Sequence, residues 1–420
     1  MNGNAYFRVK IPDMEDPRLD TTRRSPAGQL LPQEEMLEVA RPRKQLTIGV
    51  PKEKTVEENR ISLVPVGVKL LTLQGNQVIV ETGAGLSAHF PDHEYSEAGA
   101  RIVYSPEEVY SADILLKVAP PDSAETALLK PKQTLISAVQ LAIRNEEYFR
   151  ELMLRKVTAL AYELIRDRTN SFPVVRAMSE IAGCTSIFIA TEYLARPDFG
   201  RGKMFGGFTG IPPTEVLIIG AGTVGEFAAR SAIALGATVK VFDPSVYRLR
   251  RLQNNLGIRV FTSILHPKAL LESMKTADVI IGAVHSPAGK SPCLITGEMI
   301  REMKEGSIII DISIDQGGCF ETSRPTTHSQ PVYKVEGVTH YCVPNIPSRV
   351  PHTASQALNN IFVPVILDIC SQGGIEAFIK HDYGVRQGVY LFNGTLTNLP
   401  ISKLFNLPFQ DIDLLMAAFR

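Results

Sequence analysis

From residue 46 onward, short apolar runs alternate with stretches in which apolar residues recur at helical spacing. Apolar runs bounded by turn residues predict buried strands, and the stretches between them predict helices. Strands and helices that alternate in this way favour parallel sheets with helices on both faces. The predicted strands are Leu46–Val50, Gln77–Glu81, Ile102–Val103, Asp113–Val118, Thr134–Val139, Thr158–Tyr162, Val216–Ile219, Val239–Phe242, Ile258–Val260, Val279–Ala283 and Ser307–Asp311.

The predicted helices divide the chain into two halves. They are Val66–Gln74, Pro106–Ser111, Glu146–Arg155, Val175–Leu194, Glu226–Leu235, Ala354–Gln372 and Gly374–Tyr383. The long helix Val175–Leu194 leads out of the first half, and the proline-punctuated segment Val343–Pro351 precedes a return to it. We therefore predict an α/β fold with two Rossmann-like doubly wound domains, the first discontinuous, and an interdomain cleft.

The predicted boundaries give an N-terminal extension over 1–45 and a substrate domain over 46–174. A dinucleotide domain follows over 175–345, and 346–420 return to the substrate domain. The extension is rich in charge and proline, and it shows no sustained periodicity. It is typical of a surface segment with a helical turn near Gln33–Val39, or of a segment that covers a neighbouring subunit.

Composition narrows the class of protein. Lys+Arg and Asp+Glu number 44 each, so no net field favours nucleic acid or an acidic membrane as a partner. The five cysteines are scattered without a Cys-x-x-Cys motif, which is typical of reduced thiols and indicates no metal site. No run approaches 18 uninterrupted apolar residues, so we expect no membrane span. The expected location is the cytoplasm.

Residues 216–225 read Val-Leu-Ile-Ile-Gly-Ala-Gly-Thr-Val-Gly, an apolar strand that runs directly into a glycine-rich turn. Gly220 permits the tight turn, Gly222 lets the backbone approach a pyrophosphate, and Gly225 lets the helix pack against the strand. The pyrophosphate would lie on the helix N-terminus, near Thr223 and Val224, where free N–H groups favour an anion. The helix stops at Gly236, a typical C-terminal glycine.

An acid stands where a ribose-binding carboxylate is expected. Asp243 ends the next apolar strand, 243 − 225 = 18 residues after the last glycine. A carboxylate accepts from a 2′-hydroxyl and repels a 2′-phosphate, which favours NAD over NADP as the cofactor. The alternative is a glycine-rich turn in an unrelated α/β domain.

Two cations follow strand ends, where α/β proteins place ligands. Arg60 lies in the loop after the first strand, and its fork suits a substrate carboxylate. Lys117 lies inside the apolar run Ile114–Val118, near its end, where it could polarise a carbonyl or hold a carboxylate. The structural alternatives are a solvated surface charge for Arg60 and a lysine that snorkels off an edge strand for Lys117.

Two further residues follow predicted strands of the second half. Asp315, in Asp311–Gly318, could orient a proton donor or take part in proton transfer, or it could simply cap a turn. His285 lies in the loop after Val279–Ala283, which should face the cofactor. Its intrinsic pKa suits acid–base work, although a loop histidine near the nucleotide is the simpler interpretation.

Together these residues resemble the alanine dehydrogenase family, which shares its fold with the NAD-binding subunit of proton-pumping transhydrogenase. The resemblance spans residues 46–420. Its blocks are Ile48–Glu53, Glu58–Arg60, Glu81–Gly85, Leu116–Val118, Met178–Gly183, the glycine turn, Ile314–Gly318 and His340–Tyr341. Ile314–Gly318 and Gly394–Asn398 resemble the dehydrogenase rather than the transhydrogenase, and no transmembrane segment is appended.

The resemblance implies a function and roles for residues. It implies NAD-dependent, reversible oxidative deamination of L-alanine or a similar small amino acid to a 2-oxo acid and ammonia. Arg60 and Lys117 would hold the substrate, and Asp315 would complete the site. Met178 and Ser179 would line the cofactor, and Asp243 would bind its ribose. The resemblance also implies a homo-oligomer, a hexamer in this family.

One position departs from the family. Where the family has an acid–base histidine, this sequence has Gln140, in the stretch Ala138–Ala142. Glutamine hydrogen bonds but does not titrate, so it can orient a carbonyl yet cannot shuttle a proton. Lys117 or Asp315 would then carry the proton, or the reaction has changed.

Two alternative functions follow from this departure: a transhydrogenase-like hydride-transfer subunit, and a dinucleotide-binding paralogue without catalysis. Arg176, which is unfamiliar at its position, would add a second carboxylate-binding charge.

Overall fold

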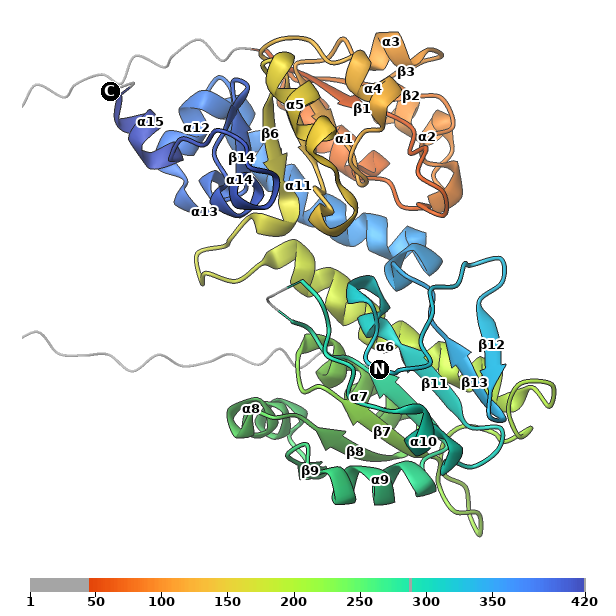
Figure 1. Ribbon diagram of the computed structural model, residues 1–420. Coiled ribbons are helices and arrows are strands. Elements are labelled where there is room, and N and C mark those ends of the chain that lie inside the picture. The colour runs from red at the N-terminus through yellow and green to blue at the C-terminus, as the bar shows by residue number, and fades with distance from the viewer. Residues whose placement is uncertain (1–44, 287–288, 419–420) are drawn as a thin grey trace, which may run out of the picture. The chain divides into compact units, whose positions relative to one another are not determined.

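A computed structural model describes residues 45–286 and 289–418, and the predicted turn at Gln33–Val39 lies outside them. The chain forms two sheets, each covered by helices on both faces (Figure 1). The α/β prediction with two Rossmann-like units is confirmed. The domain boundaries and the cleft stay predictions.

The first sheet has eight strands in the order β15-β14-β6-β5-β4-β1-β2-β3. Strands β1 to β6 run parallel in Rossmann order, and β14 and β15 add an antiparallel edge from the far end of the chain. The strands are β1 (Thr47–Val50), β2 (Gln77–Glu81), β3 (Arg101–Val103), β4 (Ile114–Leu116), β5 (Thr134–Ser137), β6 (Thr158–Ala161), β14 (Val389–Phe392) and β15 (Thr395–Leu396).

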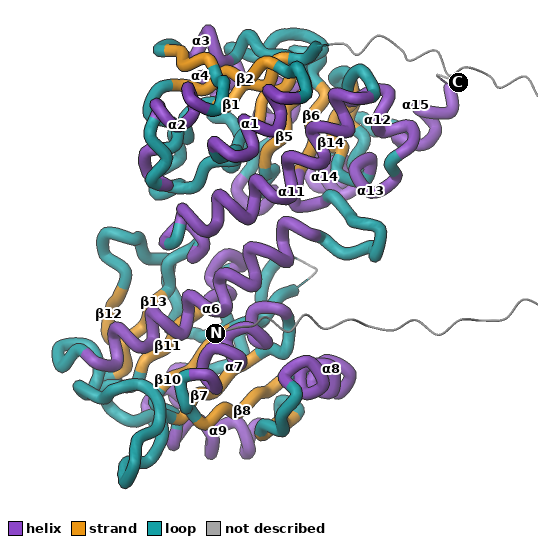
Figure 2. Tube along the Cα trace, turned by 180° about the vertical axis from the view of Figure 1, so that it is seen from behind, coloured by secondary structure: helices purple, strands orange, loops and turns teal. Residues whose placement is uncertain are grey.

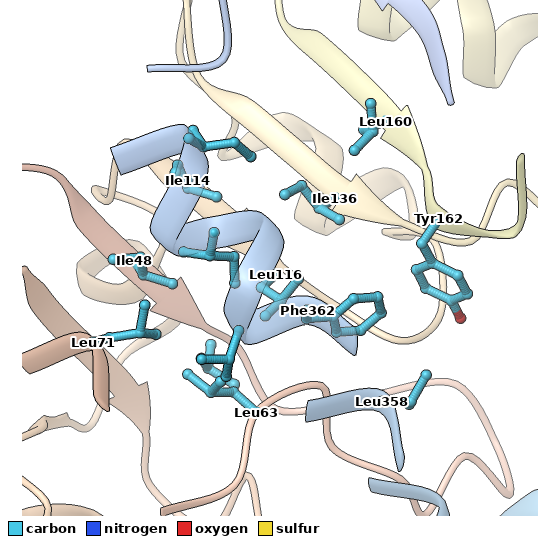
Figure 3. Packing of buried hydrophobic residues seen from close by; sticks show 14 of the residues in the cluster. Ile48, Leu63, Leu71, Ile114, Leu116, Ile136, Leu160, Tyr162, Leu358 and Phe362 are labelled. Carbon is cyan, nitrogen blue, oxygen red and sulfur yellow. The ribbon is translucent and has the colours of Figure 1, made fainter. Parts of the chain in front are cut away.

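Helices cover both faces of this sheet because its central strands are apolar on both sides. The helices are α1 (Pro65–Leu73), α2 (Asp92–Glu97), α3 (Pro106–Val109), α4 (Ser123–Ala127), α5 (Glu146–Leu154), α11 (Pro351–Ser371), α12 (Ile375–His381), α13 (Tyr383–Arg386), α14 (Leu399–Phe405) and α15 (Ile412–Ala418). Figure 3 shows α11 crossing one face, where Phe362 packs 5.2 Å from the Tyr162 ring, between ring centroids.

The second sheet has seven strands in the order β12-β13-β11-β10-β7-β8-β9, again of Rossmann type. Its strands are β7 (Glu215–Ile219), β8 (Thr238–Phe242), β9 (Phe261–Ser263), β10 (Val279–Gly282), β11 (Ile308–Asp311), β12 (Val332–Val335) and β13 (Val338–Tyr341). Its helices are α6 (Pro173–Ala195), α7 (Thr223–Ala234), α8 (Val246–Leu256), α9 (Pro267–Thr276) and α10 (Gly297–Arg301). Figure 2 shows them from behind.

The long helix α6 connects the two sheets, and it lies beside the returning helix α11 in both views (Figures 1 and 2). By length and composition alone, α6 could cross a membrane. Its buried residues pack against α7, α11 and the second sheet. Packing therefore accounts for its apolar character, as in a core helix.

Several expected elements differ from the structure. The strand expected at Ile258–Val260 is wrong: α8 ends at the left-handed Gly257, and β9 starts only at Phe261, in register with Lys240 of β8. Helix α7 begins at Thr223, three residues before the expected start, because the last glycine of the turn belongs to its first turn. The helix expected to reach Tyr383 ends at His381, where Asp382 caps a new one. Antiparallel pairs β12–β13 and β14–β15 were not expected at all.

Candidate active site

The predicted ligand-binding residues lie at the switch points of the two sheets, where the strand order reverses. Arg60 lies in the loop after β1 and Lys117 comes directly after β4, and these two strands are neighbours. In the second sheet, the glycine turn follows β7 and His285 follows the neighbouring β10. Crevices at switch points are the usual ligand sites of such sheets.

The glycine turn has the shape that a dinucleotide needs. Gly220 has φ +112°, and a Cβ on it would overlap the backbone of Ala283. A Cβ on Gly225 would overlap the carbonyl oxygen of Gly220, so this glycine is needed for packing. A Cβ on Gly222 would meet no described atom within 4 Å. The open side of the turn is therefore at Gly222, where a pyrophosphate would approach.

Helix α7 presents unpaired donors at this open side. Within the described residues, no side chain caps the helix at Gly222. The N–H groups of its first turn, at Thr223, Val224 and Gly225, have no acceptor within the helix and suit an anion. Gly183 of α6 packs so closely that a Cβ there would overlap the carbonyl oxygen of Val224. These features fit a dinucleotide pyrophosphate.

Asp243 is buried beneath the glycine turn. One carboxylate oxygen accepts from the N–H of Ala221 at 2.8 Å, and the other accepts from the N–H of Ser245 at 2.7 Å. Each oxygen keeps a second lone pair that a ribose hydroxyl could use. Arg248 lies 3.8 Å away, between Nη1 and the carboxylate. Asp243 therefore also holds the turn in place, a role that the sequence did not indicate.

Arg60 is buried, so its interpretation as a solvated surface charge is wrong. Its Nε and Nη2 donate to the two carboxylate oxygens of Glu58 at 2.7 and 2.6 Å. Its Nη1 donates to Sδ of Met178 on α6 at 3.4 Å. Glu58 thus fills one edge of the guanidinium and leaves the Nη1 edge facing Met178. Burial alone would raise the pKa of Glu58, but the charge and hydrogen bonds of Arg60 hold it below its ordinary value.

Lys117 is 1% exposed and follows a central strand, so its interpretation as a snorkelling lysine of an edge strand is wrong. Its Nζ lies 3.0 Å from Oε1 of Glu125 and 3.3 Å from Oε2 of Glu53. Burial alone would lower the pKa of Lys117, but the two carboxylates raise it. For Glu53, burial outweighs the charge of Lys117 and raises the pKa to about 7.

Asp315 links to the loop that carries Arg60. It lies in a 3₁₀ turn after β11, and its Oδ1 accepts from the N–H of Asn345 at 3.0 Å. The side chain of Asn345 donates to Oε2 of Glu58 at 3.0 Å. Asp315 is exposed to solvent. The surrounding protein still removes enough water to raise the pKa of Asp315, and the hydrogen bond from Asn345 and the charge of Arg60 offset part of this rise. Asp315 therefore does more than cap a turn: through Asn345 it is joined to Glu58.

Gln140 occupies an unusual backbone conformation in the loop after β5. Its φ and ψ are 48° and 53°, in the left-handed region. Oε1 of Glu163 accepts from the N–H of Val139 at 2.7 Å and of Gln140 at 3.2 Å. Burial raises the pKa of Glu163. Its Oε2 is buried and has no hydrogen-bond partner among the described residues. The backbone of Gln140 is thus held in place by the carboxyl group of Glu163.

The remaining predicted residues are less constrained. His285 is exposed, and the surrounding protein and the charge of Arg248 lower its pKa. It is therefore neutral at neutral pH, which fits a loop histidine better than a proton donor. Ser179 is half-buried on α6, next to Met178. Arg176, on the same helix, is largely exposed and pairs with Glu180 at 3.0 Å.

The sequence interpretation missed the acids and the amide that hold the cations. Glu53, Glu58, Glu125 and Asn345 received no role. Glu58 and Arg60, two residues apart, offered a signal because opposite charges in one loop can pair. The contact between Glu125 and Lys117 spans eight positions and a turn, and Asn345 meets Glu58 across 287 positions. Such contacts depend on the tertiary fold.

Two Rossmann-type sheets, a glycine turn open at Gly222 and two buried cations at the other switch point are features of the class of dinucleotide-dependent oxidoreductases. Comparison with known proteins narrows this class. The family models "Alanine dehydrogenase/PNT, N-terminal domain" and "Alanine dehydrogenase/PNT, C-terminal domain" match residues 49–182 and 186–399. The chain therefore belongs to the alanine dehydrogenase/PNT family, as the sequence resemblance predicted.

Individual relatives support this assignment to the family. An alanine dehydrogenase of Staphylococcus saprophyticus is 40% identical over 369 residues, which cover 88% of this chain and 99% of the relative. A solved L-alanine dehydrogenase structure matches with a TM-score of 0.81 and 38% identity, over 86% of this chain and 99% of that one. A transhydrogenase from Sinorhizobium meliloti matches with a TM-score of 0.72 and 25% identity, over 84% and 99%. The prediction of an enzyme of the alanine dehydrogenase type is confirmed at the level of the family.

Proposed function

We propose that this protein uses NAD to oxidise L-alanine, or a similar small amino acid, to the 2-oxo acid and ammonia, and that it also runs the reverse reaction. The observation that carries the proposal is the arrangement of Arg60. Glu58 holds one edge of its guanidinium, and the Nη1 edge faces Met178 on the helix that packs against the dinucleotide turn. A substrate carboxylate on that edge would place its α-carbon toward the cofactor.

The chain's own residues would divide the work. Arg60 binds the carboxylate, and Lys117 stabilises charge on the oxygen or nitrogen at the α-carbon. Asp315 and Asn345 keep Glu58 and Arg60 in position. The bound dinucleotide would supply a hydride acceptor, held by Gly220, Gly222, Gly225 and the first turn of α7. Its ribose would meet Asp243, which favours NAD over NADP.

Absorbance of NADH tests this function directly. Purified protein incubated with L-alanine and NAD should produce NADH, and pyruvate, ammonia and NADH should be consumed in the reverse assay. NADP in place of NAD should give a much lower rate. No turnover with any small amino acid in either direction would contradict the proposal.

Gln140 favours a second candidate function, a dinucleotide-binding protein without redox turnover. This candidate predicts NAD binding by calorimetry and no NADH formation, so the same two assays separate it from the first. The transhydrogenase-like alternative has less support, because the transhydrogenase match has the lower identity and TM-score.

Two further properties belong to the proposal. We expect the protein in the cytoplasm. We also expect a homo-oligomer, a hexamer by the family resemblance, which light scattering on the purified protein would measure.

A further inference from the structure

Lys117 is one member of a buried cluster of three charged groups. The side chains of Glu53, Lys117 and Glu125 are exposed by 3%, 1% and 3%. Glu53 comes from the loop after β1, Lys117 from the end of β4 and Glu125 from α4. Two carboxylates and one ammonium leave the cluster with an excess negative charge unless one carboxyl is protonated. Burying such an excess is costly, so the cluster favours an extra proton.

Glu53 is fixed by the backbone rather than by the lysine alone. Its Oε1 accepts from the N–H of Val118 at 2.6 Å, and its Oε2 accepts from the N–H of Ala119 at 3.3 Å. These donors follow Lys117 directly in sequence. Four other titratable groups interact with Glu53 through their charges. The charge of Glu58 raises the pKa of Glu53, and the charge of Glu53 in turn raises the pKa values of Arg60, Tyr110 and Tyr162.

Glu125 has a different task. Its Oε2 accepts from the N–H of Asp122, and Asp122 accepts from the N–H of Glu125 in return, which forms a capping box at the start of α4. Its Oε1 accepts from Lys117. Protonating Glu125 would disturb the cap, whereas Glu53 has no part in a helix end.

We propose that Glu53 is the proton partner of Lys117, and that the pair replaces the acid–base group missing at Gln140. This inference rests on the proposed function and deepens it. Burial raises the pKa of Glu53 to about 7, so its carboxyl changes charge where such a partner is needed. Because the two groups are coupled, the titration belongs to the pair.

The substrate reacts as the neutral amine, after its ammonium group has lost a proton to water, and hydride loss then leaves an iminium at the α-carbon. Lys117 passes a proton to the Glu53 carboxylate and becomes a neutral amine. Water attacks the iminium carbon: a C–O bond forms, an O–H bond breaks, and Lys117 takes the proton. Lys117 then returns this proton to the nitrogen as the C–N bond breaks. The remaining hydroxyl proton leaves to water, which gives the 2-oxo acid and ammonia. Glu53 then returns its proton to Lys117, which restores the ionised carboxylate and the ammonium for the next turnover.

The pH profile of kcat/KM for alanine oxidation tests the role of Glu53. Glu53 must be ionised at the start, so wild-type kcat/KM should rise with pH through an inflection near 7. Glu53→Gln mimics the protonated carboxyl. At pH values well below the inflection, kcat/KM of Glu53→Gln should equal that of the wild type. The variant should show no inflection, and above pH 7 its kcat/KM should be about 100-fold lower than that of the wild type, which is the low end of the usual contribution of acid–base catalysis.

Two matched variants complete the experiment. Glu125→Gln removes the other carboxylate of the cluster and should keep the inflection. Glu53→Asp keeps a carboxylate and should recover the inflection even if Glu53→Gln is poorly folded. An active wild type with an unchanged Glu53→Gln profile, or a rate lowered equally at every pH, would overturn the role of Glu53 alone. A wild type without turnover would overturn the proposed function and this inference with it.

Discussion

At the scale of single residues, the candidate site is a set of buried charges that are paired before any substrate arrives. Arg60 is paired with Glu58, and Lys117 with Glu53 and Glu125. The sequence indicated both cations, because each follows a strand end of a doubly wound sheet. It did not indicate their burial or their partners, since those depend on how distant loops meet.

Replacing Glu58 tests whether it orients Arg60. In Glu58→Gln, Arg60 keeps one neutral acceptor and loses the charged, two-point contact. A hydrogen bond to a charged group is worth about 1.5–3 kcal/mol, so we expect KM for alanine to rise about 10- to 100-fold. Glu97→Gln, an exposed carboxylate on α2, is the control and should leave KM unchanged. An unaltered KM in Glu58→Gln would refute the orienting role.

Gln140 offers the sharpest single substitution. Histidine tolerates the left-handed region better than most residues, and Gln140 has φ 48°, so Gln140→His should fold without new strain. If the rest of the site is intact, added acid–base help should raise kcat for alanine oxidation, within the usual range of about 10²–10⁴-fold. Gln140→Asn also suits this backbone but does not titrate, and it should give no gain. Equal rates for both variants would point to altered chemistry.

At the scale of elements, the sequence predicted the central parallel strands well because each is a short apolar run buried on both faces. The hairpin β12–β13 was missed for two reasons: β12, at the edge, is only partly buried, and β13, although buried, carries Thr339 and His340 and so lacks an apolar run. The strand expected at Ile258 was wrong because the apolar residues there leave a helix rather than enter the sheet. The glycine turn was predicted most fully, since its spacing is imposed by backbone contacts.

Substitutions of two glycines of that turn should have different effects, one on NAD binding and the other on the stability of the fold. Gly222→Ala adds a methyl group in open space, so the melting temperature should stay unchanged. The methyl group would stand where the pyrophosphate approaches, and NAD affinity should fall about 10- to 100-fold through lost charged hydrogen bonds. Gly225→Ala overlaps the backbone of Gly220 and should destabilise the fold by about 1–3 kcal/mol. Calorimetry with NAD and thermal unfolding measure the two effects, and tight NAD binding by Gly222→Ala would exclude the proposed cofactor position.

At the scale of the whole molecule, distant segments meet at the loop that carries Arg60. Glu57 accepts from the N–H of His328 at 2.8 Å, and the N–H of Asn59 donates to Ser348 at 2.8 Å. Asn345 reaches Glu58 from the same later segment. The proline-punctuated segment Val343–Pro351 predicted that the chain returns to the first half near Asn345 and Ser348. The contacts themselves join positions hundreds of residues apart and could not be predicted.

The buried carboxyls should make stability depend on pH. The pKa of Glu53 is raised from 4.5 to about 7 in the folded protein, so its contribution is complete below pH 4.5 and is lost as pH rises through 7. Glu163 and Asp315 act in the same direction, whereas the lowered pKa of Glu58 makes its contribution disappear in acid. Glu53 should therefore lower the melting temperature as pH rises from 4.5 to 7, and Glu53→Gln should lose this part of the pH dependence. Parallel curves for the two proteins would show that Glu53 is not protonated in the folded state.

The half-occupied guanidinium of Arg60 would also limit which substrates the proposed site accepts. With Glu58 held against Nε and Nη2, only the Nη1 edge remains for an incoming acid. A ligand with two carboxylates would find one anchoring edge, and its second negative charge would lie near Glu58 in a place with little water. If Arg60 binds the substrate carboxylate as proposed, a resident anion would discriminate against aspartate- or glutamate-like amino acids without any bulky side chain to exclude them.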